Sequence, residues 1–513
     1  MKLQSNILKL CLFATGLSGI VAEYILATLA TYFLGDSVIQ WTMILSVMLF
    51  SMGLGSRLSK YIEDRLLNRF IYIEFILSLL VAYASLIAYT ISTYTVYAGF
   101  VIYLLSILIG LLIGMEIPLV VRLNDSFEAL RINVSSVLEK DYYGSLAGGL
   151  FFAFVGLPYF GLTYTPLILG VVNFSVALLL LIILWSHLEK SSRRIPVIVS
   201  CITGIVLITG FFIAKPVILF GEQKKYKDKV IYSHQSRYQK IVITKWKQDY
   251  WLYINGNHQL SSLDEPMYHE PLVHPALSFS KTPYDVLVMG GGDGCAVREI
   301  LKYDKVRNIT VVDLDPAMTD LGRKHPVMLN MNQGSLNNSR VRIINEDGYT
   351  FLQKNRGFYD VIIIDLPDPR SVELGRLYSH EFYMMCNRRL RTNGVIVTQA
   401  GSPYYAARAF KCINETMRSA KFTTAMLHNQ ILTLGEWGWI IGVKDFEGQD
   451  LKNILRGLKF KNIQTSWLNN EAMSLMTSFG KDFFDDSHDP VKINKIHDPV
   501  LYGYYLKGNW ENY

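Results

Sequence analysis

Acidic side chains follow three separate apolar runs in the second half of the chain, namely Asp313, Asp347, Asp365 and Asp368. A carboxylate can accept a proton from an amine while that amine attacks an electrophile. Several carboxylates around one pocket also attract a cation. These residue types therefore point to a di- or polyamine substrate. Taken singly, Asp365-Leu-Pro-Asp-Pro369 is equally well explained as a turn, because Asp and Pro both favour turns.

A glycine-rich loop, Gly290-Gly-Gly-Asp-Gly294, lies between an apolar run and a predicted helix. Glycine lets the backbone approach a ligand closely, and the helix N-terminus that follows offers free N–H groups. Asp313 lies twenty residues beyond Asp293, a spacing that suits hydrogen bonds from ribose hydroxyls. Such a loop also fits NAD enzymes and methyltransferases. Asp293, however, would repel a pyrophosphate or an amino-acid carboxylate, which favours a donor with cationic groups.

The elements that would position these residues are alternating strands and helices over residues 281–450. Strands are predicted at 285–289, 309–312, 341–344, 361–364 and 394–397. Crossover helices between them predict a Rossmann-like open parallel sheet of the methyltransferase type. Ligands of such sheets bind beyond the carboxyl ends of the strands, where the acidic motifs lie.

A small β-strand domain is predicted ahead of this sheet, over residues 222–280. Residues 238–246 alternate in polarity, and 251–254 form a second short strand. The Asn255-Gly256 pair that follows is the strongest short signal for a hairpin turn. Residues 451–513 are interpreted as a C-terminal extension.

The first 221 residues are far more apolar than the rest. A membrane-spanning helix needs about 20 apolar residues, and seven runs meet that need, at 7–31, 38–57, 70–92, 96–121, 142–160, 163–186 and 195–219. An α-helical multi-pass domain in the cell (inner) membrane is therefore predicted, with the lipid bilayer as a partner. The net charge of +7 lies largely in loops beside these runs, which headgroups explain without nucleic acid.

The loop charges also predict an orientation. Alternate loops carry the basic residues Arg57, Lys60, Arg65, Arg69, Arg122, Arg131, Lys140, Lys190, Arg193 and Arg194. By the positive-inside rule the N-terminus is cytoplasmic, and seven spans then place the following domain on the outer face. A donor made in the cytoplasm requires the opposite side, and one miscounted span would reverse the prediction. Both sides therefore stay open.

Glu23 and Glu116 lie inside the apolar runs, where an ionisable side chain is costly. One interpretation is a path for a cationic polyamine. The interpretation that we favour is a hydrogen bond to a neighbouring helix, or a position close to the membrane surface.

An ordered set of motifs between about residues 232 and 442 resembles the spermidine synthase (polyamine aminopropyltransferase) family. The motifs are Ser236-Arg-Tyr-Gln239, Asn255-Gly-x-x-Gln259, Asp264-Glu265-x-x-Tyr268-His269-Glu270, Gly290-Gly-Gly-Asp-Gly294, Asp347-Gly348 and Asp365-x-x-Asp368-Pro369. A generic methyltransferase does not explain the run of tyrosine, histidine and glutamate. The apolar first half resembles, more loosely, the membrane-embedded multi-pass members found in bacteria.

The resemblance implies transfer of an aminopropyl group from decarboxylated S-adenosylmethionine, a nucleoside sulfonium, to putrescine or a related amine. Methylthioadenosine would be released. The implied donor contacts are Gln239, Gly290, Gly292, Asp313, Asp347 and Gly348. The implied amine contacts are His269, Asp293, Asp365 and Asp368, with Asp365 as the catalytic base. No metal and no cofactor beyond this co-substrate is expected, His258 and His274 are expected at the surface or in packing, and the family implies a homodimer.

Departures from the family pattern leave the acceptor amine open. Leu366-Pro367 replaces the usual small or hydroxyl pair between the two aspartates, and the late stretch 432–439 lacks the usual tyrosine. Glu436 in that stretch is either a further carboxylate of the pocket or a surface turn residue. Two other functions are considered: a methyltransferase that uses intact S-adenosylmethionine, and a polyamine transporter or sensor that only binds.

Overall fold

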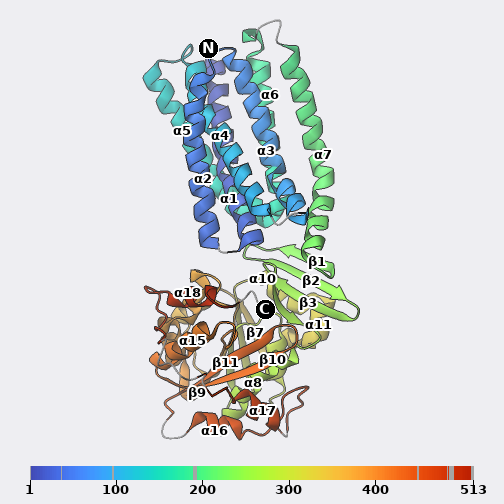
Figure 1. Cartoon of the computed structure of the whole chain (residues 1–513), viewed down its shortest axis with the longest axis vertical. Helices are drawn as coiled ribbons and strands as arrows, with labels where there is room; N and C mark the ends of the chain where they lie inside the picture. The colour runs from blue at the N-terminus through green and yellow to red at the C-terminus, as the bar shows by residue number, and fades with distance from the viewer. Residues whose placement is uncertain are drawn as a thin grey trace. The chain divides into compact units, whose positions relative to one another are not determined.

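The fold is taken from a computed structural model that describes residues 2–35, 37–94, 97–188, 193–446, 450–460, 462–481, 483 and 490–509. The chain divides into two compact units, a helical unit (residues 1–230) and an α/β unit (residues 231–513) (Figure 1). The change of composition at Gly221 falls inside the last helix of the helical unit, which runs on to Lys225.

Within the described residues, the helical unit has seven long helices: α1 (Lys2–Leu34), α2 (Ser37–Leu58), α3 (Leu66–Tyr94), α4 (Ala98–Asn124), α5 (Leu130–Phe151), α6 (Gly161–Ile183) and α7 (Arg194–Lys225). Each overlaps one of the seven apolar runs. Among the described residues, six continuous helical stretches are long and apolar enough to cross a membrane. The number is six rather than seven because α5 and α6 belong to one continuous stretch, Leu130–Ile183. The helices lie side by side as a bundle in Figure 1.

The stretch Leu130–Ile183 is a hairpin rather than one long helix. After α5 the chain continues as a π-helix, η2 (Phe152–Phe160), which ends at Gly161 with a φ of 62°. The Thr165 hydroxyl donates a hydrogen bond of 2.8 Å to the carbonyl of Gly156. Nine residues of continuous α-helix would separate these groups by about 13 Å. The chain therefore reverses at Gly161, where the sequence predicts a turn.

The interior of the helical unit holds two apolar clusters. One includes residues 7–14 of α1 and 70–75 of α3, and the other includes residues 21–30 and 77–89 of the same helices. Glu116 of α4 is buried outside both clusters. Neither of its carboxylate oxygens makes a short hydrogen bond among the described residues, but the Thr15 side chain of the neighbouring helix α1 acts on Glu116 as a hydrogen-bond partner. The favoured contact with a neighbouring helix therefore stays a prediction.

The α/β unit begins with four strands, β1 (Lys229–Gln235), β2 (Lys240–Trp246), β3 (Asp249–Ile254) and β4 (Asn257–Ser261), which form a sheet in that order. Asn255 and Gly256 join β3 to β4 and both adopt positive φ, 50° and 81°. Positive φ at both positions is the conformation of a type I′ turn. The predicted hairpin turn is therefore confirmed.

A second sheet carries the order β10-β11-β9-β8-β5-β6-β7 within the described residues. Its strands are β5 (Asp285–Gly290), β6 (Asn308–Asp313), β7 (Val341–Asn345), β8 (Tyr359–Asp365), β9 (Leu390–Gln399), β10 (Phe422–Ile431) and β11 (Gly435–Lys444). Strands β5 to β9 pair in parallel. Since β5 lies between β6 and β8, the order of the strands reverses there, and ligands of such sheets bind beyond the strand ends at this point.

The five strands predicted from sequence form the parallel part of the sheet, and the structure adds two antiparallel strands at one edge. β11 pairs antiparallel with β9, and β10 pairs antiparallel with β11. The two strands form a hairpin whose loop, residues 432–434, is very short. Antiparallel neighbours need no crossover helix, so the strand–helix alternation that revealed β5 to β9 gave no sign of this pair.

Apolar side chains of the central strands cover both faces of the sheet, because successive residues of a strand point in opposite directions. Val286 and Val288 of β5 pack with α8 (Pro266–Phe279) and α9 (Cys295–Leu301). Leu287 and Met289 belong to the cluster on the other face, which includes residues of α14 (His380–Arg389) and α15 (Ala407–Ser419).

The last part of the chain packs onto this same core. Leu455 of α16 (Leu451–Arg456) and Met473 of α17 (Asn470–Met476) join the cluster of α8 and α9. Leu501 and Tyr505 of α18 (Val500–Leu506) join the cluster of α14 and α15. The predicted extension thus shares its core with the α/β sheet.

Candidate active site

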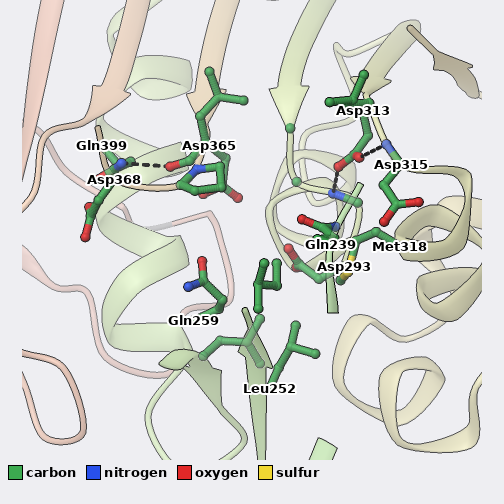
Figure 2. Close-up of a pocket in the computed structure, with 18 of the residues that line it drawn as sticks. Gln239, Leu252, Gln259, Asp293, Asp313, Asp315, Met318, Asp365, Asp368 and Gln399 are labelled. Carbon is green, nitrogen blue, oxygen red and sulfur yellow. Dashed lines mark hydrogen bonds between the residues drawn. The ribbon is translucent and has the colours of Figure 1, made fainter. Parts of the chain in front are cut away.

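A cavity of about 190 Å³ opens at the carboxyl ends of β5, β6 and β8 (Figure 2). It is several times larger than the roughly 30 Å³ of one water molecule. Eight of the predicted site residues line it: Gln239, His269, Gly290, Gly292, Asp293, Asp313, Asp365 and Asp368. The topology therefore brings side chains that are up to 129 positions apart in the sequence to one place.

The glycine loop passes directly against the ends of two strands. Gly290 and Gly291 adopt φ values of 81° and 65°, which glycine tolerates without the steric cost of a Cβ. A Cβ on Gly290 would collide with the backbone oxygen of Asp365, and a Cβ on Gly292 would lie 2.6 Å from Oδ2 of Asp313. The close approach of the loop to β8 and β6 thus explains why glycines occupy these positions.

Asp313 is fixed at the end of β6 by backbone N–H groups. Its Oδ2 accepts from Gly292 at 3.1 Å, and its Oδ1 accepts from Asp315 at 2.9 Å. Burial raises the pKa of Asp313 to about 6, although these two hydrogen bonds oppose the rise. Each carboxylate oxygen keeps a further lone pair, so the side chain can still accept a hydroxyl from a ligand.

Gln239 is presented by a tight turn that begins at Ser236. The Ser236 hydroxyl accepts from the backbone N–H groups of Tyr238 and Gln239, each at 3.0 Å. The same hydroxyl donates a hydrogen bond of 2.6 Å to Oδ2 of Asp315. Ser236 therefore joins the turn before β2 to the end of β6, and this connection carries Gln239 to the cavity opposite Asp313 (Figure 2).

Asp293 has a structural contact as well as a place in the cavity wall. Its Oδ1 accepts from the N–H of Cys295 at 2.8 Å, at the first residue of α9. The same oxygen lies 3.8 Å from Nε2 of His269. The carboxylate is therefore held at the helix N-terminus, where a negative charge is favourable, while it lines the cavity.

His269 is on α8, and its imidazole lies among the carboxylates of Glu265, Asp293 and Asp365. Its Nδ1 is 2.8 Å from Oε2 of Glu265, and Glu265 in turn accepts two hydrogen bonds from Arg298, at 2.6 and 3.0 Å. Burial by itself lowers the pKa of His269, but the Glu265 hydrogen bond and the charges of Asp293 and Asp365 outweigh it and raise the pKa to about 9. The imidazole is therefore a cation at neutral pH.

Asp365 ends β8 at the centre of the cavity wall. Its Oδ1 accepts a hydrogen bond of 2.9 Å from the hydroxyl of Tyr268, and its Oδ2 lies 4.0 Å from Nε2 of His269. Burial and the charge of Asp293 raise the pKa of Asp365 to about 6, against the opposite effects of His269 and Tyr268. A carboxyl with this pKa is mostly ionised at pH 7 and can accept a proton.

Asp368 keeps one carboxylate oxygen without a partner. Its Oδ2 accepts from the Tyr505 hydroxyl at 2.7 Å and from the Arg370 guanidinium at 3.3 Å. Its Oδ1 is buried and has no hydrogen-bond partner among the residues that the structure describes. A buried acceptor without a partner is costly, which makes Oδ1 a position where a ligand cation would be stabilised.

Asp347 and Gly348 lie outside the described lining of this cavity. Asp347 caps α12 (Gly348–Lys354), where its Oδ1 accepts from the Thr350 N–H at 2.9 Å. Its Oδ2 pairs with the Arg376 guanidinium at 2.8 Å. Since Asn345 is aligned with Asp313 in the sheet, Asp347 lies just beyond the same edge, but its carboxylate is occupied by Arg376.

Sequence reasoning missed several lining residues, including Tyr268, Gln259, Gln399 and Trp437. Tyr268 and Gln259 belong to the quoted motifs, so their positions were available as a signal. Gln399 ends β9 and donates to the Leu366 carbonyl at 2.7 Å. Glu436 is paired with His428 and lies outside the described lining.

Two histidines, His274 and His258, were expected in packing or at the surface, and their surroundings differ from each other. His274 is buried, with its Nε2 2.8 Å from Oε2 of Glu299. His258 also lines the cavity, and its ring packs against Tyr253 with the ring centroids 5.4 Å apart. The pKa of His258 is lowered by burial.

One group in the cavity has the composition of a metal site. Ligand atoms of His269, Asp293 and Asp365 lie within 4.8 Å of one another. A metal requires the neutral imidazole, whereas the surroundings of His269 favour its protonated form.

Comparisons with known proteins agree on one family. Residues 265–453 match the family model for the spermine/spermidine synthase domain. Polyamine aminopropyltransferase 2 of Aquifex aeolicus (strain VF5) is 41% identical, with 98% of this chain and 99% of that protein covered. Polyamine aminopropyltransferase of Oceanobacillus iheyensis is 37% identical, with 99% and 98% covered. A structure of spermidine synthase in complex with the transition state analogue AdoDATO matches 50% of this chain and 87% of its own, at 28% identity and a TM-score of 0.45.

Proposed function

The chain belongs to the polyamine aminopropyltransferase family, and we propose that its donor is decarboxylated S-adenosylmethionine and its acceptor putrescine or a related diamine. The observation that carries this proposal is the position of Asp365. Its carboxylate lies at the topological switch point, between the glycine loop and a second carboxylate with an unpartnered oxygen. A base and a cation anchor in one pocket are what transfer to a diamine requires.

The donor would occupy the side of the pocket formed by Gln239, Asp313 and the glycine loop. Asp313 would accept hydrogen bonds from the ribose hydroxyls. Asp293 would face the sulfonium and the aminopropyl ammonium, both of which are positive. An intact S-adenosylmethionine would instead bring a carboxylate towards Asp293, and like charges repel. This contrast favours aminopropyl transfer over methyl transfer.

The transfer itself is a displacement at carbon. The acceptor nitrogen forms a bond to the aminopropyl carbon that is attached to sulfur, while the carbon–sulfur bond breaks and its electron pair returns to sulfur. The sulfonium thereby becomes the neutral thioether of methylthioadenosine. The attacking nitrogen loses a proton, which Asp365 accepts. Tyr268 would hold Asp365 in place, because its hydroxyl binds the oxygen that does not face His269.

The far end of the acceptor would lie at Asp368. The unpartnered Oδ1 of Asp368 would bind the second ammonium of a diamine. Arg370 pairs with the other oxygen and partly neutralises this carboxylate. Further ammonium groups would meet the Arg370 cation, so we propose that a short diamine is preferred over a longer polyamine.

Product analysis tests this function. The full-length chain is incubated with each donor and putrescine, and the nucleoside product is identified. Methylthioadenosine is expected from decarboxylated S-adenosylmethionine, whereas adenosylhomocysteine from the intact donor would establish a methyltransferase. Asp365→Asn is expected to lower kcat by about 10²–10⁴ while donor binding, measured by calorimetry, stays intact. Full turnover by Asp365→Asn would refute the assignment of the base.

We also propose that the helical unit spans the cell (inner) membrane. Its apolar helices have the required length, and its basic residues concentrate in alternate loops. Seven helices with these loop charges would place the α/β unit on the outer face, whereas supply of the donor favours the cytoplasmic side, which we propose. In sealed right-side-out vesicles, added protease should then leave the α/β unit intact until detergent is added. Cleavage without detergent would place it on the outer face.

A further inference from the structure

A layer of buried polar side chains separates the two apolar clusters of the helical unit. We call it the polar layer, and it comprises Thr15, Ser18, Glu74, Ser78, Glu116, Asp141 and Asn173. On α1, α4, α5 and α6 these residues fall between members of the two clusters, and on α3 they flank the boundary. Each lies at least two turns inside its helix. Interruption of an apolar interior at one level on five helices requires a specific reason.

The polar layer is only partly satisfied by its own hydrogen bonds. Asn173 Nδ2 donates to the Ser18 hydroxyl at 2.8 Å, and the Ser78 hydroxyl donates to the Gly170 carbonyl at 2.8 Å. Both carboxylate oxygens of Glu116, and Oε1 of Glu74, make no short hydrogen bond within the described part of the chain. Oδ1 of Asn173 is buried without a partner among the described residues, and the Thr15 hydroxyl makes no short hydrogen bond there but acts on Glu116 as a hydrogen-bond partner.

The carboxylates of the polar layer also lack a counter-ion. Oδ1 of Asp141 lies against α1, only 3.0 Å from where a Cβ on Gly16 would be, and Gly16 is next to Thr15. Glu74 and Asp141 also act electrostatically on Glu116, which agrees with a shared location of these residues from α3, α5 and α4. The nearby lysines are engaged elsewhere, since Lys9 pairs with Glu128 and Lys140 with Glu139. Buried carboxylates of one sign, with no basic partner among the described residues, leave a place for a cation.

The spacing of these carboxylates favours an extended organic cation over a metal ion. Calcium takes six to eight oxygen ligands at about 2.3–2.6 Å, which demands tight convergence. Groups of three ligand atoms within 4.8 Å occur, over the described residues, only in the α/β unit. A linear amine carries separate ammonium groups joined by methylenes, which suits separate carboxylates with apolar clusters on both sides.

We propose that the polar layer is a second amine site, which binds a linear di- or polyamine inside the helical unit. Glu74, Glu116 and Asp141 pair with the ammonium groups, and the oxygens of Thr15 and Asn173 accept their remaining N–H bonds. The class of amine rests on the proposed function, because an enzyme that consumes and makes such amines has them at hand. The site itself rests on the helical unit alone.

Equilibrium dialysis of the full-length chain with radiolabelled putrescine, in detergent and at physiological salt, tests this site. The variant Asp365→Asn/Asp368→Asn silences the pocket of the α/β unit and is expected to retain one equivalent of bound putrescine. Adding Glu74→Gln/Glu116→Gln is expected to weaken that binding at least tenfold. Glu139→Gln, which removes an exposed carboxylate paired with Lys140, is the matched control and should change nothing.

Turnover measured on the same preparations separates this inference from the proposed function. Glu74→Gln/Glu116→Gln in an otherwise unchanged chain should keep turnover within about twofold, which also demonstrates a folded protein. If the double variant is not folded, Thr15→Val is expected to weaken the retained binding instead. Loss of all putrescine in the pocket-silenced variant, retention in the layer variant, or displacement by millimolar Ca²⁺ would each overturn the second amine site.

Discussion

The hydroxyl of Tyr268 donates a hydrogen bond of 2.9 Å to Oδ1 of Asp365. The two residues come from α8 and from the end of β8, so this bond joins a helix on one face of the sheet to the reacting centre. It occupies one carboxylate oxygen and leaves the other free of this hydrogen bond. If Asp365 is the base that we propose, the tyrosine positions it without blocking the second oxygen.

Replacement of Tyr268 tests this positioning. Tyr268→Phe removes the donor but keeps the ring, so kcat is expected to fall by about tenfold, the equivalent of one hydrogen bond to a charged group. Loss of a bond that favours the carboxylate also raises the pKa of Asp365. The acid limb of kcat/KM should therefore move to higher pH. A lower kcat with an unmoved limb would assign Tyr268 to packing alone.

The wild-type chain should have an acid limb set by Asp365. Because the pKa of this carboxyl is raised to about 6 by burial and by Asp293, the proton-accepting form increases as pH rises through about 6. The value of kcat/KM for the acceptor should rise tenfold per pH unit below that point and level off above it. A limb near pH 4, the value for an exposed aspartate, would contradict this environment.

Stability should depend on pH through His269. The folded chain raises the pKa of this imidazole to about 9, above the ordinary value of about 6.5. Its contribution, about 3 kcal/mol from this difference, is therefore complete below pH 6.5 and is lost as pH rises through about 9. The melting temperature should fall across that window, and His269→Gln should flatten the curve. His497→Gln, at an exposed site, should leave the curve unchanged.

A methyl group on the glycine loop should interfere with the donor. The Cβ of Gly292→Ala would lie 2.6 Å from Oδ2 of Asp313 and 3.0 Å from Met318. Asp313 must then shift, so the KM for the donor should rise at least tenfold while the KM for putrescine changes little. Gly480→Ala, whose Cβ meets no atom within 4 Å, is the control. Equal effects on both substrates would indicate general misfolding instead.

The acceptor end of the pocket is tested by Tyr505. Its hydroxyl donates to Oδ2 of Asp368 at 2.7 Å, and Tyr505→Phe should raise the KM for putrescine about tenfold without changing the KM for the donor. Tyr504→Phe, on the same helix, loses only a contact with the Lys492 N–H and should behave as wild type. A change in the donor KM would contradict this division of the pocket.

The residues at the strand ends and in the glycine loop are predictable from sequence because their signals are local. Buried parallel strands are short apolar runs, and Asp313 and Asp365 end two of them, so their meeting at one sheet edge follows from topology alone. The glycines of the loop are likewise visible in the sequence, and they meet a requirement of the backbone itself, namely positive φ and close approach to the strand ends. These features need no knowledge of distant side chains.

The partners of these residues are not predictable in the same way because their contacts are long-range. Tyr505 reaches Asp368 across 137 positions, and no spacing rule connects an isolated tyrosine with a distant aspartate. The pairing of Asp347 with Arg376 is similar, since either residue alone reads as a surface charge. The β10–β11 hairpin was not predicted from sequence for a different reason, because no crossover helix connects its two strands.

The position of α18 limits how relatives of this chain can be interpreted. The family model ends its match at residue 453, whereas the tyrosine that contacts Asp368 lies on α18. Two chains can therefore fit the model equally well, share the same sulfonium donor, and still differ in the amine that they extend. The matched segment contains the carboxylates Asp293, Asp365 and Asp368 but not Tyr505, which donates a hydrogen bond to Asp368. Relatives should therefore also be compared over α18 before a preferred amine is transferred between them.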